Sequence, residues 1–149
     1  MDDHDNRTGA LATLHTRVID ACKGYEEGRE RAETPEMTAL FGDLLEMHRA
    51  HAADLANALT ARGVVADPDG SFLQYVHKAV LKVRSAFGRL DETAVPGIVD
   101  GEDRLLELYD ETRITLPDDA ELDRLLERQR DDVARQIQRL RVMESGAEA

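Results

Sequence analysis

Residues 34–63 read TPEMTALFGDLLEMHRAHAADLANALTARG, and this stretch decides the fold. Thr34 is suited to cap a helix whose first position is Pro35, and Gly63 is suited to end it. Between them, apolar residues recur at the three- and four-residue spacing of one helix face. These residues are Met37, Leu40, Phe41, Leu44, Leu55 and Leu59. The stretch therefore predicts an amphipathic helix long enough to run the length of a helical bundle.

The rest of the chain follows the same helical period, and no stretch alternates as a half-buried strand would. Similar apolar stripes predict helices over residues 8–32, over 93–113 and from the break at Pro117 to residue 144. A shorter helix is predicted over 71–87. We expect residues 1–7 to form a disordered tail and residues 145–149 a frayed end. The sequence thus indicates a single all-α domain over residues 8–144.

The lengths of the connections constrain how these helices are arranged. The links at Glu33-Thr34 and around Pro117 are so short that each must join two antiparallel helices. Roughly 30 residues separate the two hairpins, enough for the short helix to run along the bundle as a crossover. We therefore expect a ferritin-like four-helix bundle with a short additional crossover helix between helices 2 and 3. An up-down bundle in which the short helix is a fifth full member is the alternative.

Composition excludes several classes of protein. The 149 residues carry 31 acidic and 19 basic side chains, and the net charge of −12 argues against a nucleic-acid or anionic-membrane surface. A single cysteine and the lack of a long apolar run favour a cytoplasmic protein. The chain has no glycine-rich phosphate loop, nucleophile elbow, Cys-x-x-Cys or His-Glu-x-x-His. We therefore expect none of the reactions that these motifs catalyse. Their absence favours a protein that is not an enzyme.

Some polar residues fall on the inner faces of the predicted helices, close to the middle of each helix. His48 lies near the centre of the apolar stripe of its helix, and His51 follows one turn later. Glu102 is flanked by apolar residues on the next long helix, and Gln129 lies inward on the last one. His15 lies at the border of the stripe of the first helix. These positions predict a polar layer of His48, Glu102, Gln129 and His15 halfway along an aliphatic bundle.

Two explanations of this layer are open. A buried carboxylate must find a partner or stay protonated, and a protonated His48 paired with Glu102 would satisfy both groups. In that case the layer fixes the packing of the bundle, and Gln129 and Gln136 are hydrogen-bonding spacers. Alternatively, His48, His51 and Glu102 form a three-ligand site for a zinc or iron ion.

A series of short motifs adds a family resemblance over residues 11–143. The motifs are Lys23-Gly24-Tyr25, Gly70-Ser71 followed by Val76-His77-Lys78, Gly101-Glu102-Asp103 with Tyr109, Leu116-Pro117, and Arg128-Gln129. In this order the chain resembles a bacterial family of ferritin-like four-helix-bundle proteins, related to rubrerythrins and known only as a domain of unknown function. The resemblance implies a ferritin-like fold, often taken to bind metal, in proteins whose activity is not established.

The ligands of a standard di-iron centre do not carry over to this chain. Such centres use Glu-x-x-His on two helices and one further glutamate from each of the other two. Leu45 stands three residues before His48, and His48 itself stands three before His51. Glu102 is an inward carboxylate, whereas Glu26 and Asp132 are marginal. We therefore expect no di-iron oxidase or ferroxidase centre.

Association with other proteins is the function that the sequence favours. The crossover helix carries apolar residues beside and opposite its main stripe, namely Leu73, Tyr75 and Leu81, and such a surplus suggests a second buried contact. We expect a non-catalytic bundle, with a homodimer formed through the crossover helix. The competing hypothesis is a metal-binding or redox protein that uses His48, His51 and Glu102.

Overall fold

The computed structural model describes residues 3–65, 90–116 and 118–148, and it contains no strand in these ranges. Four α-helices are present: α1 (Asp3–Arg31), α2 (Pro35–Ala61), α4 (Val95–Thr115) and α5 (Ala120–Glu148). A single 3₁₀ turn, η1 (Glu92–Ala94), leads into α4. The predicted all-α helical bundle is confirmed. None of the helices within the described ranges is both long and apolar enough to cross a membrane.

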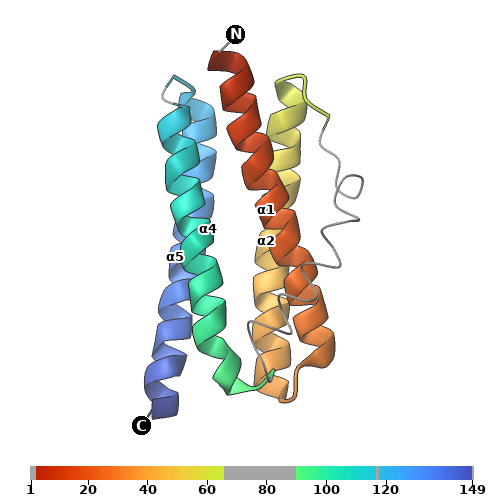
Figure 1. Ribbon diagram of the computed structural model, residues 1–149, viewed down its shortest axis with the longest axis vertical. Helices are drawn as coiled ribbons and strands as arrows, with labels where there is room; N and C mark the ends of the chain where they lie inside the picture. The colour runs from red at the N-terminus through yellow and green to blue at the C-terminus, as the bar shows by residue number, and fades with distance from the viewer. Residues whose placement is uncertain (1–2, 66–89, 117, 149) are drawn as a thin grey trace.

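The helices form two antiparallel hairpins that lie side by side, α1 with α2 and α4 with α5 (Figure 1). The starts of α2 and α4 lie at the same end of the bundle, where the backbone N–H of Glu33 donates to the carbonyl of Leu90 at 2.9 Å. α2 and α4 are therefore parallel, as a long crossover connection requires. The predicted crossover helix over 71–87 lies outside the described residues.

The signals read from residues 34–63 shape both ends of α2. The Thr34 side chain accepts a hydrogen bond from the backbone N–H of Met37 at 3.2 Å, and Pro35 occupies the first helical position. At the other end Gly63 has φ +81°, a conformation that favours glycine. The N–H groups of Gly63 and Val64 donate to the carbonyls of Thr60 and Leu59, which is the Schellman arrangement.

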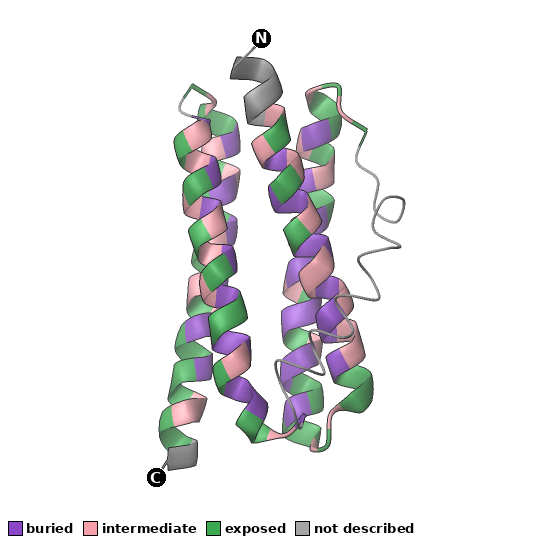
Figure 2. Ribbon diagram, in the orientation of Figure 1, coloured by how far each residue is buried: buried purple, intermediate pink, exposed green. Residues whose placement is uncertain are grey.

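The core divides into two apolar clusters along the bundle. One cluster contains residues between Leu11 and Ile19 of α1 and between Ala52 and Leu59 of α2. The other contains Cys22 and Tyr25 of α1 and the first half of α2, from Met37 to Leu45. Buried residues recur along all four helices (Figure 2). In α2 the buried His48 and His51 lie between Leu45 of one cluster and Ala52 of the other.

The structure differs from the sequence predictions at the helix ends. α1 begins at Asp3, inside the expected tail, and α5 continues to Glu148, inside the expected frayed end.

Near the end of α1, the helical period predicts that Arg29 points inward, and this prediction is wrong. Arg29 is exposed, and the neighbouring Gly28 takes the buried position. The ring of Phe41 packs so closely on Gly28 that a Cβ there would lie 2.8 Å from the Phe41 Cε1 atom. The close approach of α1 and α2 at this level therefore depends on the missing side chain.

We predict that Gly28→Ala destabilises the protein although alanine is the better helix former. Overpacking costs about 1–3 kcal/mol, and the gain in helix propensity is at most about 1 kcal/mol. Urea unfolding measures the net loss. The matched control is Gly101→Ala in α4, where a Cβ would meet no atom within 4 Å. This control should gain about 0.5–1 kcal/mol. Equal stability of the two variants would contradict the packing argument.

Candidate functional site

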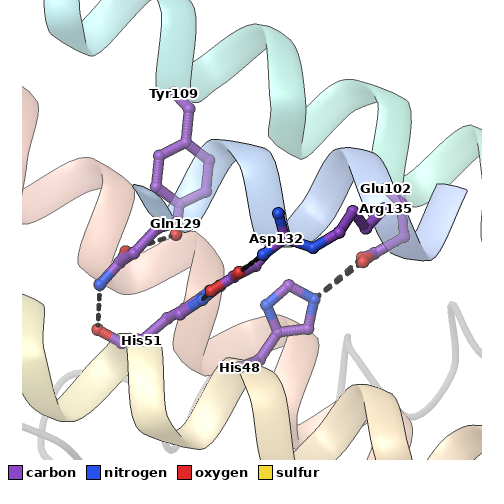
Figure 3. Close-up of polar contacts among 7 residues, drawn as sticks. All are labelled: His48, His51, Glu102, Tyr109, Gln129, Asp132 and Arg135. Carbon is purple, nitrogen blue, oxygen red and sulfur yellow. Dashed lines mark hydrogen bonds and ion pairs between the residues drawn. The ribbon is translucent and has the colours of Figure 1, made fainter. Parts of the chain in front are cut away.

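A connected layer of polar side chains lies at the middle of the bundle, and Figure 3 shows its members from α2, α4 and α5. Tyr25 adds a contribution from α1. His48 and His51 project from α2, and Glu102 from α4 faces them. The other members are Tyr25 of α1, Tyr109 of α4, and Gln129, Asp132 and Arg135 of α5.

The Glu102 carboxylate is the most deeply buried acid of this layer. His48 Nε2 lies 3.0 Å from both carboxylate oxygens, and the side chains of His48 and Glu102 are 0% and 1% exposed. The Tyr25 hydroxyl donates to Oε2 of Glu102 at 2.9 Å. The Tyr25 ring stacks on His48, with centroids 5.7 Å apart and an interplanar angle of 12°. The buried acid therefore receives hydrogen bonds from two helices.

His51 forms a second histidine–carboxylate pair, closer to solvent. Its Nε2 lies 3.0 Å from Oδ2 of Asp132, which is itself 40% exposed and is paired with Arg135 one turn along α5. The carbonyl of His51 accepts a hydrogen bond from Gln129 at 3.2 Å. Gln129 in turn accepts one from the Tyr109 hydroxyl at 2.7 Å. The backbone and the ring of His51 are thus both held by α5.

The hydrogen bonds determine which tautomer of the two histidines suits the site. A carboxylate only accepts, so Nε2 of His48 and of His51 must each carry the donated proton. In a neutral ring, Nδ1 then bears a free lone pair. Both Nδ1 atoms are buried and have no hydrogen-bond partner in the described part of the protein. The two rings meet edge to face with centroids 5.9 Å apart.

Burial also sets the proton affinities around the layer. Desolvation lowers the pKa of His51, an effect that its hydrogen bond to Asp132 partly opposes. Desolvation likewise lowers the pKa of His15. Burial, together with the nearby negative charge of Glu102, raises the pKa of Tyr25 well above its ordinary value. The imidazole of His51 therefore stays neutral, and the Tyr25 hydroxyl keeps its proton.

The structure brings most of the predicted site residues together. His48 and Glu102 are in direct contact, and His51 and Gln129 are joined one step further along the same layer. All four are buried, and so is His15 on α1. No hydrogen bond among the described side chains connects His15 to the others, so its place in the layer is one of burial only.

The three-ligand metal hypothesis meets a specific geometric difficulty. In the ranges that the structure covers, no group of three or more His, Cys, Asp or Glu side chains is arranged to hold a metal ion. His48 and Glu102 face each other directly, and Nε2 of His51 is directed to Asp132. Glu102 is also the only carboxylate that is buried among the residues with described burial. The residues present therefore do not fit a di-iron centre, which needs several carboxylates.

Four members of the layer were not predicted from the sequence: Tyr25, Tyr109, Asp132 and Arg135. The helical period places Tyr25 in the apolar stripe of α1, and the structure adds the hydrogen bond from its hydroxyl to Glu102. Asp132 was judged marginal, although it is the partner of His51. The His51–Asp132 pair could have been predicted from the position of Asp132 at the border between the core and the surface, because the short side chain of aspartate suits such a position.

We predict that Glu102→Leu destabilises the fold by about 3–5 kcal/mol, since it removes one partner of a buried pair. His48 Nε2 and the Tyr25 hydroxyl would become buried donors without an acceptor. Glu102→Gln keeps an acceptor and should lose less. The control is Glu107→Leu, at an exposed position of the same helix. It should change stability by no more than about 0.5 kcal/mol. Equal urea midpoints for the two leucine variants would contradict the role of Glu102.

Comparison with known families matches residues 7–113 to the family described as Domain of unknown function (DUF2383). The match covers α1, α2 and nearly all of α4, and so includes Tyr25, His48, His51 and Glu102. No curated protein and no solved structure matched the chain in the corresponding comparisons. Because the matched region spans well over half of the sequence, the chain belongs to this family of unknown function.

Proposed function

We propose that this protein binds a metal ion in its core through the Nδ1 atoms of His48 and His51. The observation that carries the proposal is that these two atoms are buried, have no hydrogen-bond partner among the described residues and lie on rings one helical turn apart. A buried acceptor without a donor costs about 1–3 kcal/mol. A bound cation would use both lone pairs at once.

The carboxylates of Glu102 and Asp132 support this proposal because they accept hydrogen bonds from the two histidines; they are not proposed as metal ligands. A histidine that binds a metal usually donates its other ring N–H to a carboxylate or carbonyl, which fixes the tautomer and the orientation of the ring. Both histidines have this outer hydrogen bond, His48 to Glu102 and His51 to Asp132. The two negative charges would also offset the charge of a divalent ion close by.

The ligand type favours zinc or iron among the common ions. Neutral imidazole suits zinc, copper, iron and nickel, whereas magnesium and calcium prefer oxygen ligands. Zinc has no preference for geometry from its d electrons and accepts water or other small ligands beside protein nitrogens. The proposed role is binding of the ion, and it assigns no reaction to the site.

Calorimetric titration of tag-free protein with zinc and with iron(II) tests the proposal. We predict one ion per chain for the wild type. The double variant His48→Gln/His51→Gln keeps polar side chains at both positions and should abolish binding. Glu102→Gln should weaken binding by about 10–100-fold, the effect expected when an outer hydrogen bond of a ligand is altered.

The matched control is His15→Gln, which removes another buried histidine from outside the proposed ligand pair. Its affinity should equal that of the wild type. If the double variant does not fold, as judged by circular dichroism, the two single variants serve in its place, and each should lose most of the affinity. A wild type that binds neither ion would overturn the proposal, and so would unchanged affinity in the histidine variants.

Protein association through residues 71–87 is the second candidate function. The observation in its favour is the surplus of apolar residues in this segment, which exceeds what one helix face can bury. We predict a homodimer by light scattering. The variant Leu73→Ser/Leu81→Ser should shift it to a monomer, with Val65→Ser, at an exposed position, as the control. A wild type that stays monomeric at high concentration would contradict this function.

A further inference from the structure

A pocket of ≈ 260 Å³ opens on the surface between α2 and α5, next to the polar layer. His51 of α2 and Leu125 and Gln129 of α5 line it. The other lining side chains are charged: Asp54, Arg128, Asp131, Asp132 and Arg135. The pocket therefore reaches from solvent to one of the two histidines of the proposed metal site.

Of the two histidines of the proposed metal site, His51 lines this pocket and His48 does not. His51 is 4% exposed, and its partner Asp132 is 40% exposed. His48 is 0% exposed and lies further inside, against Tyr25 and Glu102. Figure 3 shows His48 with Nε2 toward Glu102 and its other ring nitrogen on the side of His51. An ion that enters from the pocket would thus meet His51 first and His48 behind it.

Three aspartates and two arginines line the pocket, so its carboxylates exceed its basic groups by one. Asp132 is engaged by His51 and Arg135, and two further carboxylates, Asp54 and Asp131, are exposed at the pocket. Carboxylates grouped at an opening raise the local concentration of cations and increase their rate of association. The unpartnered Nδ1 atom of His51 independently indicates a ligand at the inner end.

We propose that the pocket between α2 and α5 is the route by which a divalent cation enters and leaves the core, with Asp54 and Asp131 attracting it. The proposal rests on the metal-binding function proposed above. It makes a kinetic claim that the equilibrium titration does not test. A route is recognised by changes in rate, because an obstacle in it slows entry and exit by the same factor and leaves affinity unchanged.

The first experiment places a large side chain in the route. Leu125→Trp should slow both the uptake of zinc, followed by stopped flow, and its release to a competing chelator. Both rates should fall several-fold by the same factor, with unchanged affinity. The control is Leu106→Trp on α4, a partly buried leucine that does not line the pocket. Wild-type rates in Leu125→Trp, or equal slowing in the control, would overturn the route.

The second experiment removes the charges at the opening. Asp54 and Asp131 are both exposed, so the fold should be unchanged. Asp54→Asn/Asp131→Asn should slow uptake several-fold, reduce its dependence on salt and leave release unchanged. Glu36→Gln/Glu121→Gln changes exposed acids of the same two helices away from the pocket and should have no effect. Unchanged uptake in the aspartate variant overturns the route alone. A wild type that takes up no zinc overturns the binding site itself.

Discussion

The buried carboxylate of Glu102 is the constraint on which the arrangement of the bundle depends. An ionised acid in an apolar interior is very costly unless hydrogen bonds replace the lost water. Its donors are His48 and Tyr25, both from the other hairpin. Neither hairpin can therefore bury its apolar face on the other without bringing these three groups to the same level. The two hairpins can therefore pack together only in the arrangement that also gives Glu102 its hydrogen-bond donors.

This requirement explains why the polar layer lies between two apolar clusters. Aliphatic side chains tolerate sliding of one helix along another, because dispersion contacts have little direction. Hydrogen bonds to a buried carboxylate do not, since they weaken steeply with distance and angle. Three buried links between the hairpins run from Tyr25 and His48 to Glu102 and from Gln129 to the His51 carbonyl, and a partly buried one runs from His51 to Asp132. They fix the register that the aliphatic clusters alone leave loose.

The helices and the inward direction of the central polar residues were predictable from the sequence, because residues three or four positions apart lie on the same face of a helix. The caps of α2 at Thr34 and Gly63 were predictable for the same local reasons. The period does not reveal which atoms meet, since that depends on side-chain length and rotamer. Tyr25 therefore appeared only as an apolar residue. Arg29 was placed inward because the period cannot show that the packing of Phe41 requires a glycine beside it.

The same distinction between direction and atomic contact changes the view of the metal hypothesis. If only the faces of the helices are considered, the side chains of His48, His51 and Glu102 point to the same place, and all three could be metal ligands. At the level of atoms, Glu102 already accepts from His48 and Tyr25, and Asp132 accepts from His51. What these bonds leave unused is one lone pair on each histidine, at the two Nδ1 atoms. A carboxylate that holds an imidazole in one tautomer contributes more to such a site from behind the ring than it could as a third ligand. The proposed binding of a cation would therefore use the two lone pairs that the bonds stabilising the fold leave over.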